Sequence, residues 1–194
     1  SRLAPLTKHR PKPLIPFQQK PLLHHHIEKA IAANFSKIII NTCHGSLIKN
    51  HLQALSYPIE IKVVEEPYLS PLDTAYGITN ALSWLGDEPF ALISGDIYSN
   101  YDYSSLKNLK INDGHLILVR GDSCDFDLKN GTISGPGLLT YANIGVFAPA
   151  IFENIRSKKS LGQVIRSGGQ YSGELFNGIW LNVGTFKELL QESK

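Results

Sequence analysis

Apolar residues recur at helical spacing early in the chain and then give way to short, nearly continuous apolar runs. Between residues 21 and 35 the apolar side chains follow a period close to that of a helix, which predicts a helix there. The β-branched run SKIIINT that follows predicts a strand. The same alternation then predicts helices over 45–55 and 72–86 and strands over 59–66 and 89–96. The first half therefore has a βαβ order.

The second half of the chain has a more mixed pattern. It predicts strands at GHLILVR, over 138–147 and over 178–184, and a hairpin with its turn at LKNGT. It also predicts helices over 104–110, 148–155 and 159–166. A closing helix is expected over 185–193, with Thr185 as its N-cap. Continuous apolar strands are typical of sheets that helices cover on both faces. We therefore expect the α/β class: a three-layer αβα, Rossmann-like mixed sheet.

Length and composition fit one domain over residues 1–194, with a modest net charge of +2. This charge gives no support to nucleic acid or a membrane surface as the partner. Cys43 and Cys124 lack the spacing of a metal site, which fits a reducing compartment and predicts a cytoplasmic protein. No apolar run approaches the roughly 18 residues of a membrane span.

The opening stretch SRLAPLTKHRPKPLIPF is rich in prolines and cations. Its prolines forbid a continuous helix, so Arg2, Lys8, Arg10 and Lys12 stand on an extended loop. Such a loop suits an anionic ligand. The alternative is an ordinary basic loop in solvent.

A carboxylate follows the apolar strand expected over 89–96. Ligands of open α/β sheets bind beyond the carboxyl ends of the strands, so Asp96 is well placed to hold a metal ion or act as a base. Gly95 before it allows a ligand to approach the backbone closely. Asp96 could equally cap the segment that follows.

The stretch RLAPLTKHRPKPLIP resembles the signature GxGTR-x9-PKP of the sugar nucleotidylyltransferases, which join a nucleoside triphosphate to a sugar 1-phosphate. LGDEPFALISGDIYSNYDYSSL resembles the metal-binding segment of this family, LTYANIGVFAPAIF its sugar-pocket strand, and YSGELFNGIWLNVGT its C-terminal segment. Within the family, the pattern is most similar to the short N-acetylmuramate 1-phosphate uridylyltransferases of bacterial cell-wall recycling.

The resemblance implies a fold of the nucleotide-diphospho-sugar transferase type and Mg²⁺ as cofactor. It also implies a strand and a glycine-rich loop, roughly 15 to 25 residues, ahead of Ser1. The partners it implies are a nucleoside triphosphate, with UTP favoured, and a sugar 1-phosphate. The oligomeric state is left open.

The resemblance also assigns roles to the charged residues. Arg2 would bind the triphosphate and the developing pyrophosphate, and Lys12 the α-phosphate or the sugar phosphate. Asp96 would bind Mg²⁺. Asn182 stands where most members carry a second metal-binding Asp; it is a metal candidate or a plain turn residue, because an amide offers one oxygen and no charge.

The remaining candidates belong to the two substrate pockets. Thr74 and Gly77 in LDTAYGI, together with Gly95, would contact the nucleotide, although Thr74 also suits the first turn of a helix. Asn143 would meet the sugar hydroxyls or acetamido group, or else close hydrogen bonds of the sheet. Asp125 in CDFDL is expected to face the sugar pocket.

Three other interpretations remain. The reaction could use another pair, such as CTP with phosphocholine, or dTTP or UTP with a hexose 1-phosphate. Asn182 motivates a degenerate protein that binds a nucleotide sugar without turnover. A dehydrogenase-like phosphate-binding module lacks support, since no GxGxxG follows a strand.

The run HHH at 24–26 is no metal cluster, because successive helical residues point about 100° apart.

Overall fold

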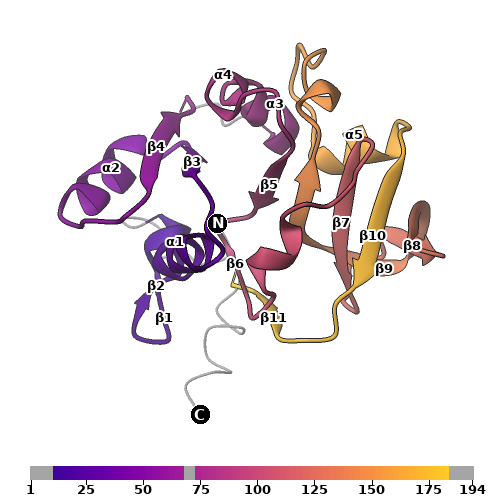
Figure 1. The fold of residues 1–194 in the computed structure, drawn as a ribbon, viewed down its shortest axis with the longest axis horizontal. Helices are drawn as coiled ribbons and strands as arrows, with labels where there is room; N and C mark the ends of the chain where they lie inside the picture. The colour runs from indigo at the N-terminus through magenta and orange to yellow at the C-terminus, as the bar shows by residue number, and fades with distance from the viewer. Residues whose placement is uncertain (1–10, 68–72, 184–194) are drawn as a thin grey trace.

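The computed structural model describes residues 11–67 and 73–183. Arg2 and the helix expected over 185–193, with Thr185 as its N-cap, lie outside these residues. Figure 1 shows one group of strands beside helices α1 and α2, and a larger group beside α5. These two groups and the strands between them position the candidate site.

The N-terminal part of the described chain runs through a short turn into the first helix. The 3₁₀ helix η2 (Lys12–Leu14) is followed by the hairpin strands β1 (Pro16–Phe17) and β2 (Lys20–Pro21). Helix α1 (Leu22–Ala32) follows directly, as the helical pattern predicts. Its apolar face, including Leu22, Leu23 and Ile27, is buried.

Strands β3 (Lys37–Thr42) and β4 (Glu60–Glu65) form a parallel pair connected by helix α2 (Gly45–Gln53). This is the βαβ unit that the sequence predicts. Ile48 of α2 is fully buried and packs in one cluster with the apolar residues of α1 and β3. Because β3 pairs only with β4 among the described strands, its side chains are only partly buried. The strand expected ahead of Ser1 remains a prediction.

The larger sheet is mixed and has the order β10–β7–β9–β5, with β8 paired to β9. Its members are β5 (Phe90–Ile93), β7 (Gly114–Val119), β8 (Phe126–Lys129), β9 (Thr132–Phe147) and β10 (Tyr171–Leu175). Strand β10 runs parallel to β7, whereas β9 runs antiparallel to its neighbours. All six residues of β7 are buried, as expected for a strand covered on both faces.

Both faces of this sheet are covered by other parts of the chain. Leu116 and Leu118 of β7 pack with α3 (Thr74–Thr79) and α5 (Leu161–Arg166). Ile117 and Val119, which point to the other face, pack with Ile97 and with residues next to α1. The three-layer mixed α/β fold is therefore confirmed.

A two-stranded antiparallel ribbon, β6 (Ile97–Ser99) with β11 (Trp180–Asn182), links the end of β5 to the C-terminal part of the chain. Both described cysteines, Cys43 and Cys124, are free. No helix among the described residues is long and apolar enough to cross a membrane.

Three predicted helices differ in the structure. The helix expected over 72–86 is two short ones, α3 and α4 (Leu82–Leu85), because the backbone N–H groups of Asn80 and Ala81 bond three residues back instead of four. The helix over 104–110 is a 3₁₀ turn, η3 (Tyr103–Leu106), since Asn108 turns into a left-handed conformation. The helix over 148–155 is only η4 (Pro149–Ile151), because the chain forms tight turns that place Phe152 in the core.

From their size and apolar character, Trp84 and Trp180 are both predicted to be core residues, and for Trp84 this prediction is wrong. Trp84 is 45% exposed, with Lys62 Nζ lying 3.8 Å from the centre of its ring. The ring gains a cation–π contact at the surface rather than burial. Trp180, by contrast, packs against the core, and its indole nitrogen donates a hydrogen bond to the Ala142 carbonyl.

Candidate active site

The carboxylate of Asp96 lies just beyond the carboxyl end of β5, and each of its oxygens has a different partner. Oδ2 accepts a hydrogen bond from Lys12 Nζ at 3.1 Å, and Oδ1 accepts one from Ser94 Oγ at 2.8 Å. The Lys12 and Asp96 side chains are 34% and 33% exposed. The structure thus brings together two residues that lie 84 positions apart and leaves both accessible to a ligand.

Gly95 explains how the loop that carries Lys12 comes so close to this strand end. A Cβ on Gly95 would lie 3.2 Å from Pro13 Cγ, which is tighter than an ordinary van der Waals contact. Glycine therefore lets η2 pack against the end of β5. The packing role is established, and a contact between Gly95 and a nucleotide remains a prediction.

Asn143 lies beside the same strand end. It has a φ of +56° within an irregular stretch of β9, a conformation that asparagine tolerates better than most residues. Its carbonyl accepts a hydrogen bond from the Ser94 backbone at 3.0 Å. The backbone of this sugar-pocket candidate is thus joined to the segment that ends in Asp96.

Asn182 approaches Asp96 from the ribbon. It pairs with Ile97, and the next residue, Val183, donates its backbone N–H to the Asp96 carbonyl at 2.9 Å. Among the described residues, no group of three or more His, Cys, Asp or Glu is placed to hold a metal ion. One carboxylate, with an asparagine on the neighbouring strand, nevertheless fits Mg²⁺, which proteins commonly bind through one or two carboxylates together with substrate phosphates.

The nucleotide candidates Thr74 and Gly77 lie on α3, near the carboxyl ends of β3 and β4. Thr74 is the exposed first residue of the helix, so its interpretation as a residue of the first helical turn is confirmed. A Cβ on Gly77 would collide with Glu66 Oε1 and lie 2.7 Å from Asn41 Nδ2. These two side chains are hydrogen-bonded to each other. Gly77 therefore has a packing role, and its contact with a nucleotide remains a prediction.

Asp125 lies directly before β8 and is hydrogen-bonded to β9. Its Oδ2 accepts a hydrogen bond from the Tyr141 backbone at 3.0 Å, and its own backbone N–H donates to the Leu139 carbonyl at 2.9 Å. These bonds hold the strand that carries Asn143. A direct contact of Asp125 with a sugar remains a prediction.

The three consecutive histidines of α1 turn to different partners. His24 Nε2 lies 2.8 Å from His51 Nε2 on α2, His25 Nε2 lies 2.9 Å from the Phe17 carbonyl, and His26 Nδ1 lies 2.8 Å from the Tyr103 hydroxyl. The prediction that they do not converge on one ion is confirmed.

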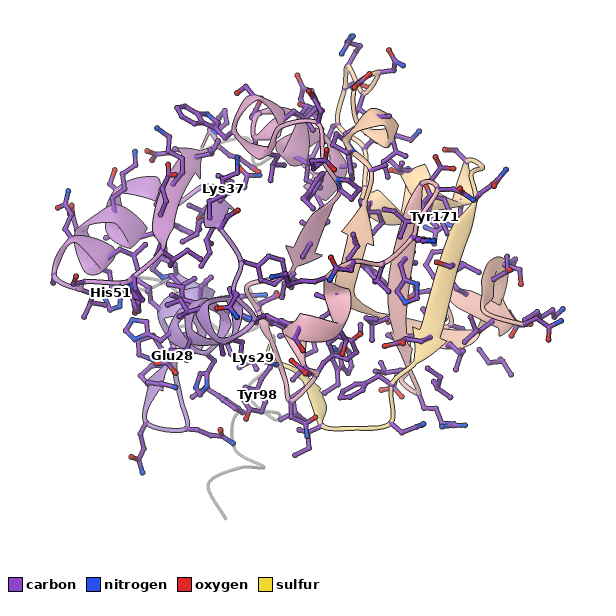
Figure 2. The ribbon with its side chains drawn as sticks, viewed as in Figure 1. Glu28, Lys29, Lys37, His51, Tyr98 and Tyr171 are labelled. Carbon is purple, nitrogen blue, oxygen red and sulfur yellow. The ribbon has the colours of Figure 1, made fainter. Side chains whose placement is uncertain are left out.

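Helix α1 is fixed to β6, the strand that follows Asp96. Lys29 Nζ donates to the Ser99 carbonyl at 2.8 Å and lies 4.2 Å from the centre of the Tyr103 ring. Figure 2 shows Lys29 on α1, in the region between this helix and β6. Burial lowers the pKa of Lys29 to about 8. Burial, with a further contribution from Lys29, lowers the pKa of His26 to about 4.

The low pKa of His26 predicts a loss of stability in mild acid. Between pH 6.5 and 4 the unfolded chain binds a proton at His26 that the folded chain rejects, so stability falls as the pH falls. Urea unfolding should show a loss from this group of about 2 kcal/mol between pH 7 and pH 5. His26→Asn, which removes the titrating ring and offers Tyr103 an amide, should reduce that loss.

The matched control is His25→Asn, which changes the neighbouring residue and should keep the wild-type loss. An unchanged pH dependence in His26→Asn would show that His26 is not the group responsible.

Ser94 and Pro13 contribute to the site but were not predicted from the sequence. Ser94 orients Asp96, and Pro13 seats the Lys12 loop against Gly95. The available signals were the spacing S-x-D in SGD and the proline directly after Lys12. Neither pattern by itself distinguishes a positioning residue from a turn residue.

Comparison with known proteins identifies the family. Residues 1–123, more than half of the chain, match the Nucleotidyl transferase family. The chain belongs to this family. It is 31% identical to the N-acetylmuramate alpha-1-phosphate uridylyltransferase of Neisseria meningitidis serogroup B, over 95% of this chain and 88% of that protein.

Other relatives of this nucleotidyl transferase are named for substrates that differ from those of the Neisseria enzyme. It is 24% identical to the mannose-1-phosphate guanylyltransferase catalytic subunit beta of Danio rerio, over 98% of this chain but only 60% of the relative. Two solved structures share its fold. HddC from Yersinia pseudotuberculosis, complexed with GMP-PN, has a TM-score of 0.76 and 18% identity, covering 93% of this chain and 88% of HddC.

The second is a putative glucose-1-phosphate thymidylyltransferase from Bacillus anthracis. It has a TM-score of 0.78 and 16% identity, covering 98% of this chain and 88% of that one. The agreement extends over nearly the whole nucleotidyl transferase, so the expected fold type is confirmed.

Proposed function

We propose that this nucleotidyl transferase joins a nucleoside triphosphate to a sugar 1-phosphate and releases pyrophosphate. The observation that carries the proposal is the pairing of Lys12 with Asp96 at the carboxyl end of β5. Asn143 and Asn182 lie on the segments next to this pair. A cation and a carboxylate at one strand end, with two asparagines on the adjoining segments, suit a substrate with several phosphates and a sugar.

The reaction needs positioning and charge stabilisation rather than a nucleophile from the protein. An oxygen of the sugar phosphate attacks the α-phosphorus of the triphosphate, a new P–O bond forms, and the bond to the β-phosphate breaks so that pyrophosphate leaves. The two substrates are both anions and repel each other. The protein must therefore hold them together and stabilise the charge that builds on pyrophosphate.

Each charged residue has a separate task in this scheme. Lys12 holds the α-phosphate or the sugar phosphate, and Arg2 binds the triphosphate and the departing pyrophosphate. Asp96, with Asn182 as the second ligand, holds Mg²⁺. When bound, Mg²⁺ neutralises phosphate charge and aligns the phosphates for the displacement. Asn143 binds the sugar, while Thr74, Gly77 and Gly95 border the nucleotide.

We propose UTP and N-acetylmuramate 1-phosphate as the substrate pair, in cell-wall recycling in the cytoplasm. The relative from Neisseria meningitidis supports this pair, since the alignment covers most of both proteins. A second candidate is GTP with another sugar 1-phosphate. The guanylyltransferase relative and the likeness to HddC with its bound GMP-PN favour this alternative.

A substrate panel tests the pair. The full-length protein is given Mg²⁺ and each of UTP, GTP, CTP, dTTP and ATP, with N-acetylmuramate, N-acetylglucosamine, mannose and glucose 1-phosphates and with phosphocholine. The proposal expects the highest kcat/KM for UTP with N-acetylmuramate 1-phosphate. A higher value for GTP with any sugar would replace the proposed pair by the second candidate.

Asn143→Gly tests the sugar contact without disturbing the backbone. Glycine adopts a φ of +56° without strain, so only the amide side chain is lost. Loss of its hydrogen bonds should raise the KM for the sugar phosphate about threefold to tenfold and leave the KM for the nucleotide unchanged. Steady-state kinetics with each substrate varied in turn measure both values.

The matched control is Asn130→Gly, which replaces another left-handed asparagine in the hairpin turn between β8 and β9. It should leave both KM values unchanged. An unchanged KM for the sugar phosphate in Asn143→Gly would remove Asn143 from the sugar pocket.

A further inference from the structure

We infer that Lys12 and the bound metal ion compete for the same oxygen, Asp96 Oδ2. In the protein without ligands, the Lys12–Asp96 ion pair then occupies both side chains that the ligands need. This inference rests on the proposed function, because it takes Asp96 as the metal ligand and Lys12 as the phosphate ligand. It adds a regulation of that site. The ion pair must open before either residue performs its task.

The two oxygens of Asp96 are not equivalent. Oδ1 is held by the Ser94 hydroxyl, and the Ser94 backbone is itself fixed by the Asn143 carbonyl. Oδ2 is held by Lys12, whose long side chain comes from a different part of the chain. Ser94 can therefore keep the carboxylate oriented while Oδ2 changes partner. Ser94 acts here as a positioning residue.

The ion pair is weak enough to exchange. Both side chains are about a third exposed, and ion pairs in contact with water contribute little net stability. Opening the pair should therefore weaken binding of the first ligand only about twofold to fivefold. The pair biases the empty site without locking it.

The exchange couples the two ligands. A cation on Asp96 releases Lys12 for a phosphate, and a phosphate on Lys12 releases Asp96 for a cation. Because linkage between two sites is reciprocal, each ligand should strengthen the other by the same factor. This coupling favours two states of the site. In one, Lys12 and Asp96 form their ion pair, and in the other, the metal and a phosphate are both bound.

The chain offers a matched control for the ion pair. Lys20, eight residues after Lys12, forms an ion pair with Glu28, and its side chain is also about one-third exposed. Glu28 belongs to α1 and not to the end of β5. Figure 2 shows Glu28 on α1 facing the α2 side, where His51 lies. The Lys20–Glu28 pair should not respond to a metal on Asp96.

Competitive acetylation of lysines, read by peptide mass spectrometry, tests the exchange. The full-length protein without nucleotide is labelled with and without Mg²⁺ at constant ionic strength. Mg²⁺ alone should increase labelling of Lys12 about twofold to fivefold and leave Lys20 unchanged. Unchanged or reduced labelling of Lys12 would overturn the inference.

Asp96→Asn provides the second measurement. Lys12 should then be labelled at the higher rate with or without Mg²⁺, and pyrophosphate in EDTA should bind about twofold to fivefold more tightly than to the wild type. A pyrophosphate affinity equal to that of the wild type would contradict the exchange. Neither measurement requires turnover, so a failure of the inference can be distinguished from a failure of the proposed function, in which no substrate pair reacts.

Discussion

Asp96→Ala is expected to lower the rate of pyrophosphate release by about a hundredfold or more while the protein stays folded. The carboxylate is the charged metal candidate of the site, and its loss leaves the phosphates without their neutralising ion. Because the side chain is one-third exposed, its removal should leave no cavity in the core. Steady-state kinetics and thermal unfolding of the purified variant measure both effects.

Asp87→Ala is the matched control, since it removes an exposed carboxylate from the turn before β5. Its rate should equal that of the wild type. If Asp96→Ala released pyrophosphate within tenfold of the wild-type rate, about 1.4 kcal/mol, Asp96 would not be the metal ligand.

Lys12→Ala should also cost about a hundredfold or more in kcat, because a charge that stabilises the reacting phosphates is removed. The effect differs from that of Asp96→Ala in one respect. Loss of Lys12 frees Asp96 from its ion pair, so binding of Mg²⁺ should persist. Measuring kcat together with metal binding separates the two roles.

Lys20→Ala is the control for Lys12→Ala, because it also removes a lysine from an ion pair near α1. It should keep wild-type turnover. Near-normal turnover in Lys12→Ala would contradict the role assigned to this residue.

The elements with the strongest local signals were predictable from the sequence. Helix α1 follows its apolar period, and the β3–α2–β4 unit follows its alternation of helical and β-branched runs. The break between α3 and α4 was not predictable, because it depends on a local tightening of the backbone hydrogen bonds at Asn80 and Ala81 that the apolar pattern does not show.

The same distinction applies to the site. Lys12 and Asp96 were predictable because a signature and a strand end mark them. The orientation of Asp96 was not, since it depends on Ser94, whose backbone is fixed by Asn143 on a strand that lies far away in the sequence. A left-handed asparagine within a strand has no clear signal in the sequence. The roles of Thr74, Gly77, Gly95 and Asp125 toward a substrate remain predictions.

The measurement that tests the central claim most directly is release of pyrophosphate by the full-length protein with Mg²⁺, UTP and N-acetylmuramate 1-phosphate. The account predicts release that requires both substrates, equals the amount of nucleotide sugar formed, and stops when EDTA is added. If no pair of nucleoside triphosphate and sugar 1-phosphate releases pyrophosphate although nucleotide binds, the protein is a degenerate binder and the proposed function is wrong.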